Sequence, residues 1–197
     1  MKTLRIAILG TAALLGACTT STNIAGPIDV TRFHLGQPPE RTTVSIEPLS
    51  SNETISPEYQ LYAEAVVGQL ERQGYVRSTS DMASGYIAGV SFVRTSRGFV
   101  RGRSPVSIGI GGGSFGGNVG VGGGASIPIG GGGEAEVIAT ELKVQLRRRS
   151  NDTVIWEGRA VTEGAGEGAN SAVTAQRLAS AMFRDFPGES GITITVK

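Results

Sequence analysis

The sequence predicts an α+β domain with a mostly antiparallel sheet, two helices packed on one face of the sheet, and a flexible glycine-rich insert between two strands. Three observations support this fold class. Two segments repeat their apolar residues every three or four positions and carry capping residues at their ends. Two other segments alternate apolar and polar residues and are joined by a polar turn. Before this pair, residues 109–133 consist largely of glycine.

Two strands are expected ahead of the first helix. Residues 27–35 alternate, but each face mixes apolar and polar side chains, which is typical of an edge strand. Residues 42–48 are expected to form a second short strand, with Val44 and Ile46 pointing inward. One side of the first strand carries Ile28, Val30, Arg32 and His34.

The first helix is expected over residues 56–74. Ser56 is a good N-cap, Pro57 suits the first helical position, and Glu58 complements the helix dipole. Gly74 stands where helices commonly end. One apolar stripe runs along this helix and consists of Tyr59, Tyr62, Val66 and Leu70.

The second half of the domain is expected to be a central strand, a hairpin and a second helix. Residues 86–93 have apolar residues on both faces, which suits a central strand. Residues 136–149 and 153–162 alternate on either side of a polar turn, so they predict a hairpin. The second helix is expected over residues 169–188, and residues 192–196 can add a final strand. The hairpin residues expected to face inward are Ile138, Thr140, Leu142, Val144, Leu146, Val154, Trp156 and Ala160.

The first residues are typical of a secretory leader. Lys2 and Arg5 give a positive start, and residues 6–15 form an apolar run that is shorter than the ~20 residues of a membrane-spanning helix. The run leads to Leu-Gly-Ala directly before Cys18, a pattern that resembles the lipobox of bacterial lipoproteins. The resemblance implies diacylglycerol on the Cys18 sulfur, cleavage before Cys18 and acylation of the new amino terminus. More than one acyl chain is needed for stable anchoring, and this pattern supplies it.

These features divide the chain into a signal peptide (1–17), a lipidated N-terminus and tether (18–26) and a single α+β domain (27–197), with the insert at about 104–133. Thr19 follows the cysteine, whereas an aspartate there usually means retention in the inner membrane. We therefore expect anchoring in the outer membrane with the domain facing the periplasm. The expected partners are the membrane, through the lipid, and an envelope protein or cell-wall component.

The composition argues against several functional classes. The chain has 18 basic and 17 acidic side chains and a formal net charge of +1, so no bulk attraction to nucleic acid is expected. Its single cysteine leaves the exported domain without a disulfide or a thiolate metal site. With one histidine and no calcium-loop spacing, we expect neither a metal site nor a cofactor.

Two catalytic motif strings overlap at residues 111–116 inside the glycine-rich insert. The string G-x-G-x-x-G binds a dinucleotide only where a strand runs into a helix, and here more glycines follow instead. The string G-x-S-x-G needs a histidine after the serine, but the only histidine, His34, precedes Ser114. We therefore expect that the protein is not an enzyme.

Four arginines lead into the insert within a segment that has no acidic residue: Arg94, Arg97, Arg101 and Arg103. One interpretation is an anion-binding site for lipid phosphate or a cell-wall carboxylate. The favoured interpretation is a solvated loop. In the insert itself, the conformational entropy of so many glycines favours a mobile loop in a lone chain. Its Val/Ile–Gly alternation would also suit hairpins that pair between subunits or enter a membrane within a closed barrel.

Several segments together resemble the Gram-negative lipoproteins grouped as domain of unknown function 4136, over about residues 28–188. They are DVTRFH, YAEAVVGQLERQGYV, TELKVQLRRRSNDTVIWEGRAV and AVTAQRLASAMFRDFPG. The shared motifs are structural: Trp-x-Gly, here Trp156 to Gly158, and Phe-Pro, here Phe186-Pro187. Trp156 is accordingly expected in the core rather than as a ligand platform. Family members often carry tyrosine or tryptophan in the glycine-rich middle, where this chain has only Phe115.

The resemblance brings no catalytic residues and no assigned activity. The leading hypothesis is an outer-membrane-anchored periplasmic lipoprotein that acts as a non-catalytic interaction or envelope-structural module. The alternative is an oligomeric or membrane-inserting assembly that uses the glycine-rich hairpin. A periplasmic enzyme is the third and least favoured hypothesis, and the sequence does not indicate an oligomeric state.

Overall fold

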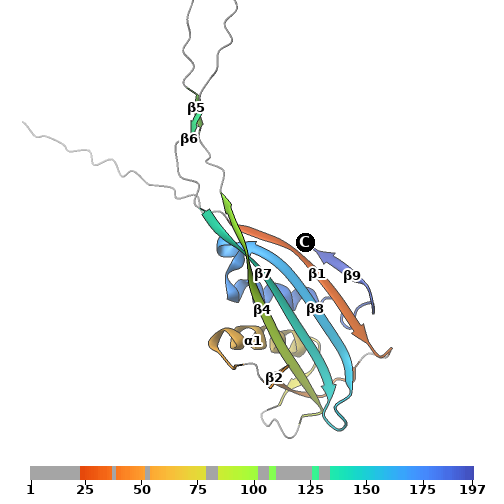
Figure 1. Cartoon of the computed structure of the whole chain (residues 1–197). Helices are drawn as coiled ribbons and strands as arrows, with labels where there is room; N and C mark the ends of the chain where they lie inside the picture. Colours follow the sequence, from red (N-terminus) through yellow and green to blue (C-terminus); the bar gives the residue numbers. More distant parts are fainter. Residues whose placement is uncertain are drawn as a thin grey trace, which may run out of the picture.

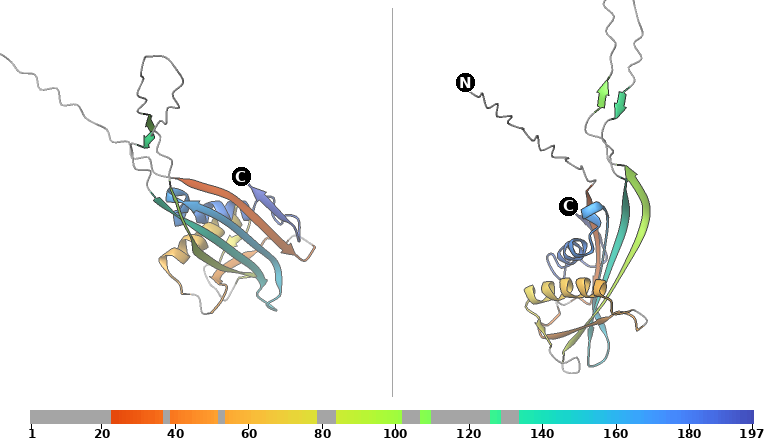
Figure 2. Two further views of the ribbon diagram at one scale, coloured as in Figure 1. Left: turned by 45° about the horizontal axis from the view of Figure 1, so that its top comes forward. Right: turned by 90° about the vertical axis from the view of Figure 1, so that its left-hand side faces the viewer.

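Two helices lie against one face of a seven-stranded sheet (Figures 1 and 2). The computed structural model describes residues 23–36, 39–51, 54–78, 84–101, 107–109, 126–128 and 134–197. The predicted α+β class and the two helices are confirmed. The elements of the main body are β1 (Ile24–His34), β2 (Thr43–Pro48), α1 (Pro57–Arg72), β3 (Val76–Arg77), β4 (Tyr86–Arg101), β7 (Glu134–Arg148), β8 (Val154–Ala165), the short 3₁₀ helix η2 (Gly166–Ala169), α2 (Ser171–Met182) and β9 (Thr193–Val196).

The sheet is mixed, so the prediction of a mostly antiparallel sheet is wrong. Its strand order is β3-β2-β4-β7-β8-β1-β9. β2 pairs in parallel with both β3 and β4, while β4, β7, β8, β1 and β9 pair antiparallel. The physical reason is α1, which follows β2 and carries the chain back along the sheet, so the next strands start at the same end as β2.

β1 is an interior strand for part of its length, so its prediction as an edge strand is also wrong. It pairs with β8 along its length and with β9 from Ile28 to Thr31. β9 is the final strand that the sequence allowed, and it covers the edge that β1 would otherwise expose. The mixed faces of β1 are explained by Arg32, a charged residue that points to the helix side and is buried there.

β1 and β7 begin, and β4 and β8 end, at the same end of the sheet, which we call the insert end. It is defined by Ile24, Arg101, Glu134 and Ala165, which the register brings together at the ends of four strands. Most of the predicted insert lies outside the described residues. Within it, β5 (Ser107–Gly109) and β6 (Ser126–Pro128) pair antiparallel as a separate two-stranded sheet.

The helix ends follow the predicted capping chemistry. The Ser56 hydroxyl accepts a hydrogen bond from the Tyr59 amide at 3.0 Å, with Pro57 in the first turn of α1. Gly74 has φ +92°, the left-handed conformation that glycine tolerates after a helix. α2 begins where the Asn170 side chain accepts hydrogen bonds from the amides of Ala172 and Val173.

The core lies between the helices and the inner face of the sheet. The hairpin prediction is confirmed, because β7 and β8 pair antiparallel and alternate residues of both are buried. Trp156 is fully buried, as expected, and its ring stacks on Phe183 with the centroids 5.2 Å apart. The largest fully buried side chains are Trp156, Tyr62, Phe183, Leu70, Leu142, Leu146, Leu178 and Met182.

Candidate functional site

Arg94 links the sheet to the N-terminal ends of both helices. Its Nη1 donates to Glu58 Oε1 at 2.8 Å and to Ser171 Oγ at 2.6 Å, and its Nη2 donates to the Ala169 carbonyl. The Ser171 hydroxyl donates to the same Glu58 carboxylate at 2.6 Å. The hydrogen bond from Ser171, followed by that from Arg94 and by its charge, holds the pKa of Glu58 below its ordinary value against the effect of burial. Arg94 therefore has a structural role here.

Arg97 and Arg101 lie toward the insert end and are exposed. Arg97 Nε lies 3.7 Å from Glu163 Oε1, and Arg101 Nε lies 2.7 Å from Glu134 Oε1. Exposed pairs of this kind contribute little to stability and leave their charges accessible to solvent. Arg103 lies outside the described residues. The four arginines therefore do not form one site with Arg94 at its centre, and anion binding by the other three stays a prediction.

Arg32 is a buried arginine that sequence reasoning placed on the strand but did not assign to a site. Only 4% of it is exposed, and it donates from Nε to the Met182 carbonyl at 2.9 Å and from Nη2 to the Ala181 carbonyl at 3.0 Å. These bonds satisfy carbonyl groups at the C-terminal end of α2, where helix carbonyls lack partners within the helix. Burial lowers the pKa of Arg32, and the nearby Asp185 carboxylate opposes that shift.

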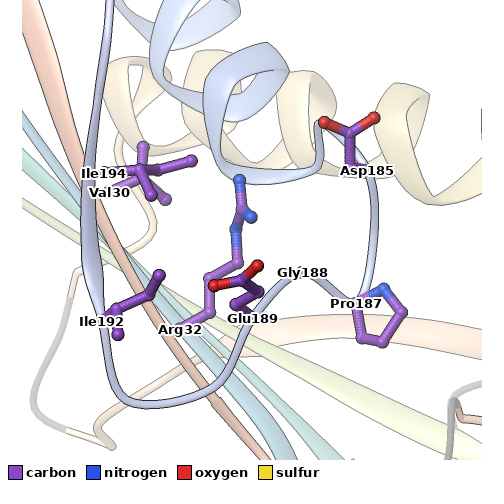
Figure 3. A pocket seen from close by; sticks show the side chains of 8 residues that line it. All are labelled: Val30, Arg32, Asp185, Pro187, Gly188, Glu189, Ile192 and Ile194. Atoms are coloured by element: carbon purple, nitrogen blue, oxygen red, sulfur yellow. The ribbon is translucent and has the colours of Figure 1, made fainter.

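A cavity of about 390 Å³ opens beside Arg32, between the β1–β9 edge and the loop that follows α2 (Figure 3). Figure 3 shows the Arg32 guanidinium reaching from the strand toward the end of the helix, with Asp185 and Glu189 on the loop side. Because both side-chain hydrogen bonds of Arg32 go to carbonyl groups at the end of α2, its main role is to hold α2 on the sheet. The lining residues are Val30, Arg32, Asp185, Pro187, Gly188, Glu189, Ile192 and Ile194.

The lone histidine and the lone tryptophan both support this same loop. His34 Nε2 lies 3.1 Å from the Gly188 carbonyl oxygen, and Trp156 Nε1 donates to the Pro187 carbonyl at 3.0 Å. Both are therefore engaged in backbone contacts. Among the described residues, no group of three or more His, Cys, Asp and Glu side chains is placed to hold a metal ion.

A second hollow of about 390 Å³ lies on the helix side, between α1, α2 and the β1–β9 edge. We call it the basic cleft and define it by four cationic residues that line it: Arg72, Arg177, Arg184 and Lys197. Its other lining residues are neutral: Ile28, Gln69, Gln176, Ser180, Ala181 and Val196. An anion in this hollow would meet several positive side chains at once.

The basic cleft draws on three separate parts of the chain, and for this reason sequence reasoning missed it. Arg72 ends α1, Arg177 and Arg184 belong to α2 and the loop after it, and Lys197 follows β9. Taken singly in the sequence, each of them resembles an ordinary exposed charged residue. The available signal was weak: Arg177 and Arg184 are seven residues apart, two helical turns, so both would fall on one side of the helix predicted over residues 169–188.

An apolar hollow of about 480 Å³ lies at the insert end of the sheet, near the start of β1. Its apolar lining residues are Ile24, Pro27, Val100, Val137 and Val161. Nearby, Phe99 is 69% exposed, although it stands within β4. In the described part of the chain, no helix is long and apolar enough to cross a membrane.

The fold and these side-chain clusters define a small α+β domain, in which Arg32 and Arg94 form hydrogen bonds that link the sheet to the helices. Residues 41–188 match the family described as a domain of unknown function, DUF4136. The chain therefore belongs to the DUF4136 family, as the resemblance in its sequence predicted.

One relative in sequence and several solved structures are similar to this chain. An uncharacterised protein of Zymomonas mobilis subsp. mobilis is 33% identical over 213 residues, which cover 87% of this chain and 80% of that protein. A PelC dodecamer from Paraburkholderia phytofirmans has a TM-score of 0.44 at 12% identity, covering 83% of this chain and 99% of that chain. A PDZ domain protein from Parabacteroides distasonis has a TM-score of 0.45 at 8% identity, covering 87% of this chain and 39% of that one.

Proposed function

We propose that this protein is an outer-membrane-anchored periplasmic lipoprotein that serves as a non-catalytic interaction or envelope-structural module. The observation that carries the proposal is the position of Cys18 directly after an apolar run and Leu-Gly-Ala. The spacing between this cysteine and the fold supports it, because β1 begins at Ile24, only six residues later. A lipid on Cys18 would hold the domain close to the membrane surface.

The interaction role is supported by the one-sided coverage of the sheet. The helices lie on one face (Figure 2). Exposed apolar side chains occur on β1 and β4, including Phe33 and Val93, which are 53% and 56% exposed. Single exposed apolar residues are common, but here they share the sheet with charged cross-strand pairs such as Arg159 and Glu141. Such a mixed surface suits a protein partner of the envelope or a cell-wall component.

Labelling with radioactive palmitate tests the anchor. The wild-type chain should take up label and fractionate with the outer membrane, while Cys18→Ser should take up none. Thr19→Asp is the matched control for location, because it keeps the acylated cysteine and introduces the residue associated with inner-membrane retention. It should be labelled but move to the inner-membrane fraction. Continued labelling of Cys18→Ser would refute the anchor.

Cross-linking in intact cells followed by pull-down tests the interaction role. The wild-type chain should capture a reproducible envelope partner. A triple substitution of Arg97, Arg101 and Arg103 by alanine asks whether the exposed arginines contribute, and Arg148→Ala provides an exposed arginine far from the insert end as a control. Unchanged capture by the triple variant would remove these arginines from the interaction.

A second candidate function is the oligomeric or membrane-inserting assembly. It is favoured by one observation: β5 and β6 pair antiparallel, which brings the two flanks of the glycine-rich run together as a hairpin would require. Detergent-stable oligomers or leakage from liposomes would support it. A monomer whose amides between residues 109 and 133 exchange at random-coil rates would exclude it.

A further inference from the structure

We propose that the basic cleft binds the phosphoryl headgroup of an anionic phospholipid in the membrane that carries the anchor. The cleft gathers four positive side chains, Arg72, Arg177, Arg184 and Lys197, around one hollow. All of its lining side chains belong to described residues, and none of them is acidic. Arginine and lysine side chains in this arrangement are typical ligands of phosphate oxygens.

The cleft differs from the rest of the molecule in how its charges are balanced. Most basic side chains elsewhere in the described residues pair with carboxylates, as in Arg77–Glu64, Arg149–Glu47 and Arg159–Glu141, although Arg32, Arg41 and Arg148 do not. In the described part of the chain, by contrast, none of the four cleft cations forms an ion pair with a carboxylate side chain. Like charges around one hollow repel each other, and a bound anion removes that repulsion.

Helix dipoles account for two of the four cations but not for the others. Arg72 lies in the last turn of α1 and Arg184 lies just after α2, and a positive charge is favourable at each of these ends. Arg177 lies in the middle of α2, where the dipole offers no such reason. One of its nitrogens, Nη1, is buried and has no hydrogen-bond partner among the described residues. A buried guanidinium nitrogen without an acceptor is costly unless an anion lies near it.

Arg177 also connects the cleft to the tether. Its Nη2 donates to the Gly26 carbonyl at 2.6 Å, and the adjoining β1–β9 pair places Val196 opposite Ile28. Gly26 is eight residues beyond Cys18, so an extended chain can separate them by at most about 28 Å. A cleft this close to the anchor can reach lipid headgroups. The closeness of the cleft to the membrane rests on the proposed lipid anchor, whereas the arrangement of charges in the cleft does not.

The decisive experiment measures binding of a short-chain, water-soluble phosphatidylglycerol to the full chain by calorimetry. The chain carries Cys18→Ser, so acylation cannot contribute to binding. The test variant combines Arg72→Gln with Arg184→Gln, because neither side chain makes a hydrogen bond or ion pair in the described structure, so their replacement should not disturb the fold. The matched control combines Lys143→Gln with Arg148→Gln, which remove the same charge from two exposed residues of β7 outside the cleft.

The wild-type cleft should bind phosphatidylglycerol more tightly than phosphatidylcholine of the same chain length, and added salt should weaken the binding. Loss of charge-assisted contacts in the test variant should weaken binding by about tenfold or more, while the control pair should stay within about twofold of the wild type. Replacing the same two residues by lysine should restore most of the affinity. Unchanged emission from Trp156 checks that each variant is folded.

Three results would overturn the proposal. Equal binding of the two lipids would mean that the headgroup charge is not recognised. Equal losses in the test and control variants would mean that general electrostatic attraction, rather than the cleft, binds the lipid. Binding of inorganic phosphate as tight as that of phosphatidylglycerol would assign the cleft to a soluble anion. Palmitate labelling reports on the anchor independently, so failure of the anchor and failure of the cleft give different results.

Discussion

Replacing Gly158 with alanine should destabilise the domain, because the indole of Trp156 and the side chain of Met182 already fill the space beside it. A Cβ at position 158 would lie 2.4 Å from Trp156 Cη2 and 2.9 Å from both Cγ and Sδ of Met182. These distances are far below ordinary van der Waals contact. The Trp-x-Gly motif in β8 therefore has a packing explanation: the glycine leaves room for the ring of the tryptophan two residues before it.

The indole cannot easily move away from the added methyl group. Its ring centroid lies 5.2 Å from that of Phe183 and 5.2 Å from that of Phe186, and its Nε1 donates to the Pro187 carbonyl. Overpacking of a filled core costs about 1–3 kcal/mol. For a domain of this size, each kcal/mol lowers Tm by about 2–4 °C, so a cost near 2 kcal/mol predicts a decrease of about 4–8 °C.

Tryptophan fluorescence during urea and thermal unfolding measures this effect directly, because Trp156 is the only tryptophan in the chain. Gly68→Ala is the matched control: it lies within α1, and an added Cβ would meet no atom within 4 Å. That substitution should raise stability by about 0.5–1 kcal/mol, as alanine is favoured over glycine in a helix. If Gly158→Ala were as stable as the wild type while Gly68→Ala behaved as expected, the packing explanation would be refuted.

Three further predictions concern buried or partnered polar groups. Arg32→Met should lower the free energy of unfolding by about 3 kcal/mol, since the helix-end carbonyls lose two charge-assisted hydrogen bonds; urea unfolding measures it against Arg148→Met, an exposed control. Glu58 has a folded-state pKa below its unfolded value of 4.5, so its carboxylate stabilises the fold above that value and loses this effect as pH falls through the folded pKa. Glu58→Gln should therefore be less stable than the wild type at neutral pH, and the two Tm values should converge on acidification; a constant gap would contradict the pairing. Burial raises the pKa of Tyr75 from 10.0 to about 12, so its contribution to stability is present below pH 10 and is lost as pH rises through 12. Tyr75→Phe should lose stability less steeply over that interval, as monitored by circular dichroism; parallel curves would argue against a shifted tyrosine.

Local patterns in the sequence were sufficient to predict most of the individual elements. The Ser56–Pro57 start of α1 and Gly74 after it satisfy caps that depend only on neighbouring residues, and the structure has both. The β7–β8 hairpin is also local, because a short polar turn joins two alternating segments. The family followed from the sequence for the same reason, since its motifs lie within these elements.

Pairings between distant segments could not be read in this way. The parallel register of β2 with β4 depends on how α1 packs after leaving the sheet, and no residue in either strand specifies it alone. Arg94 looked like one member of an arginine cluster, but the fold places it against Glu58 and Ser171 from two helices. Its role changed because partner choice is set by packing rather than by spacing in the sequence.

The sequence by itself determined the capped helices, the hairpin and the family, and it predicts a secretory leader that ends at the single cysteine, because each depends on residues that are close together in the chain. Only the tertiary structure decided that Arg32 caps α2 from a strand 150 residues away and that Arg72, Arg177, Arg184 and Lys197 line one hollow. The interaction free energy of a charged side chain depends on the groups that surround it in space. Those groups become neighbours only after helices and strands have packed, so the chemistry of the basic cleft is a property of the fold.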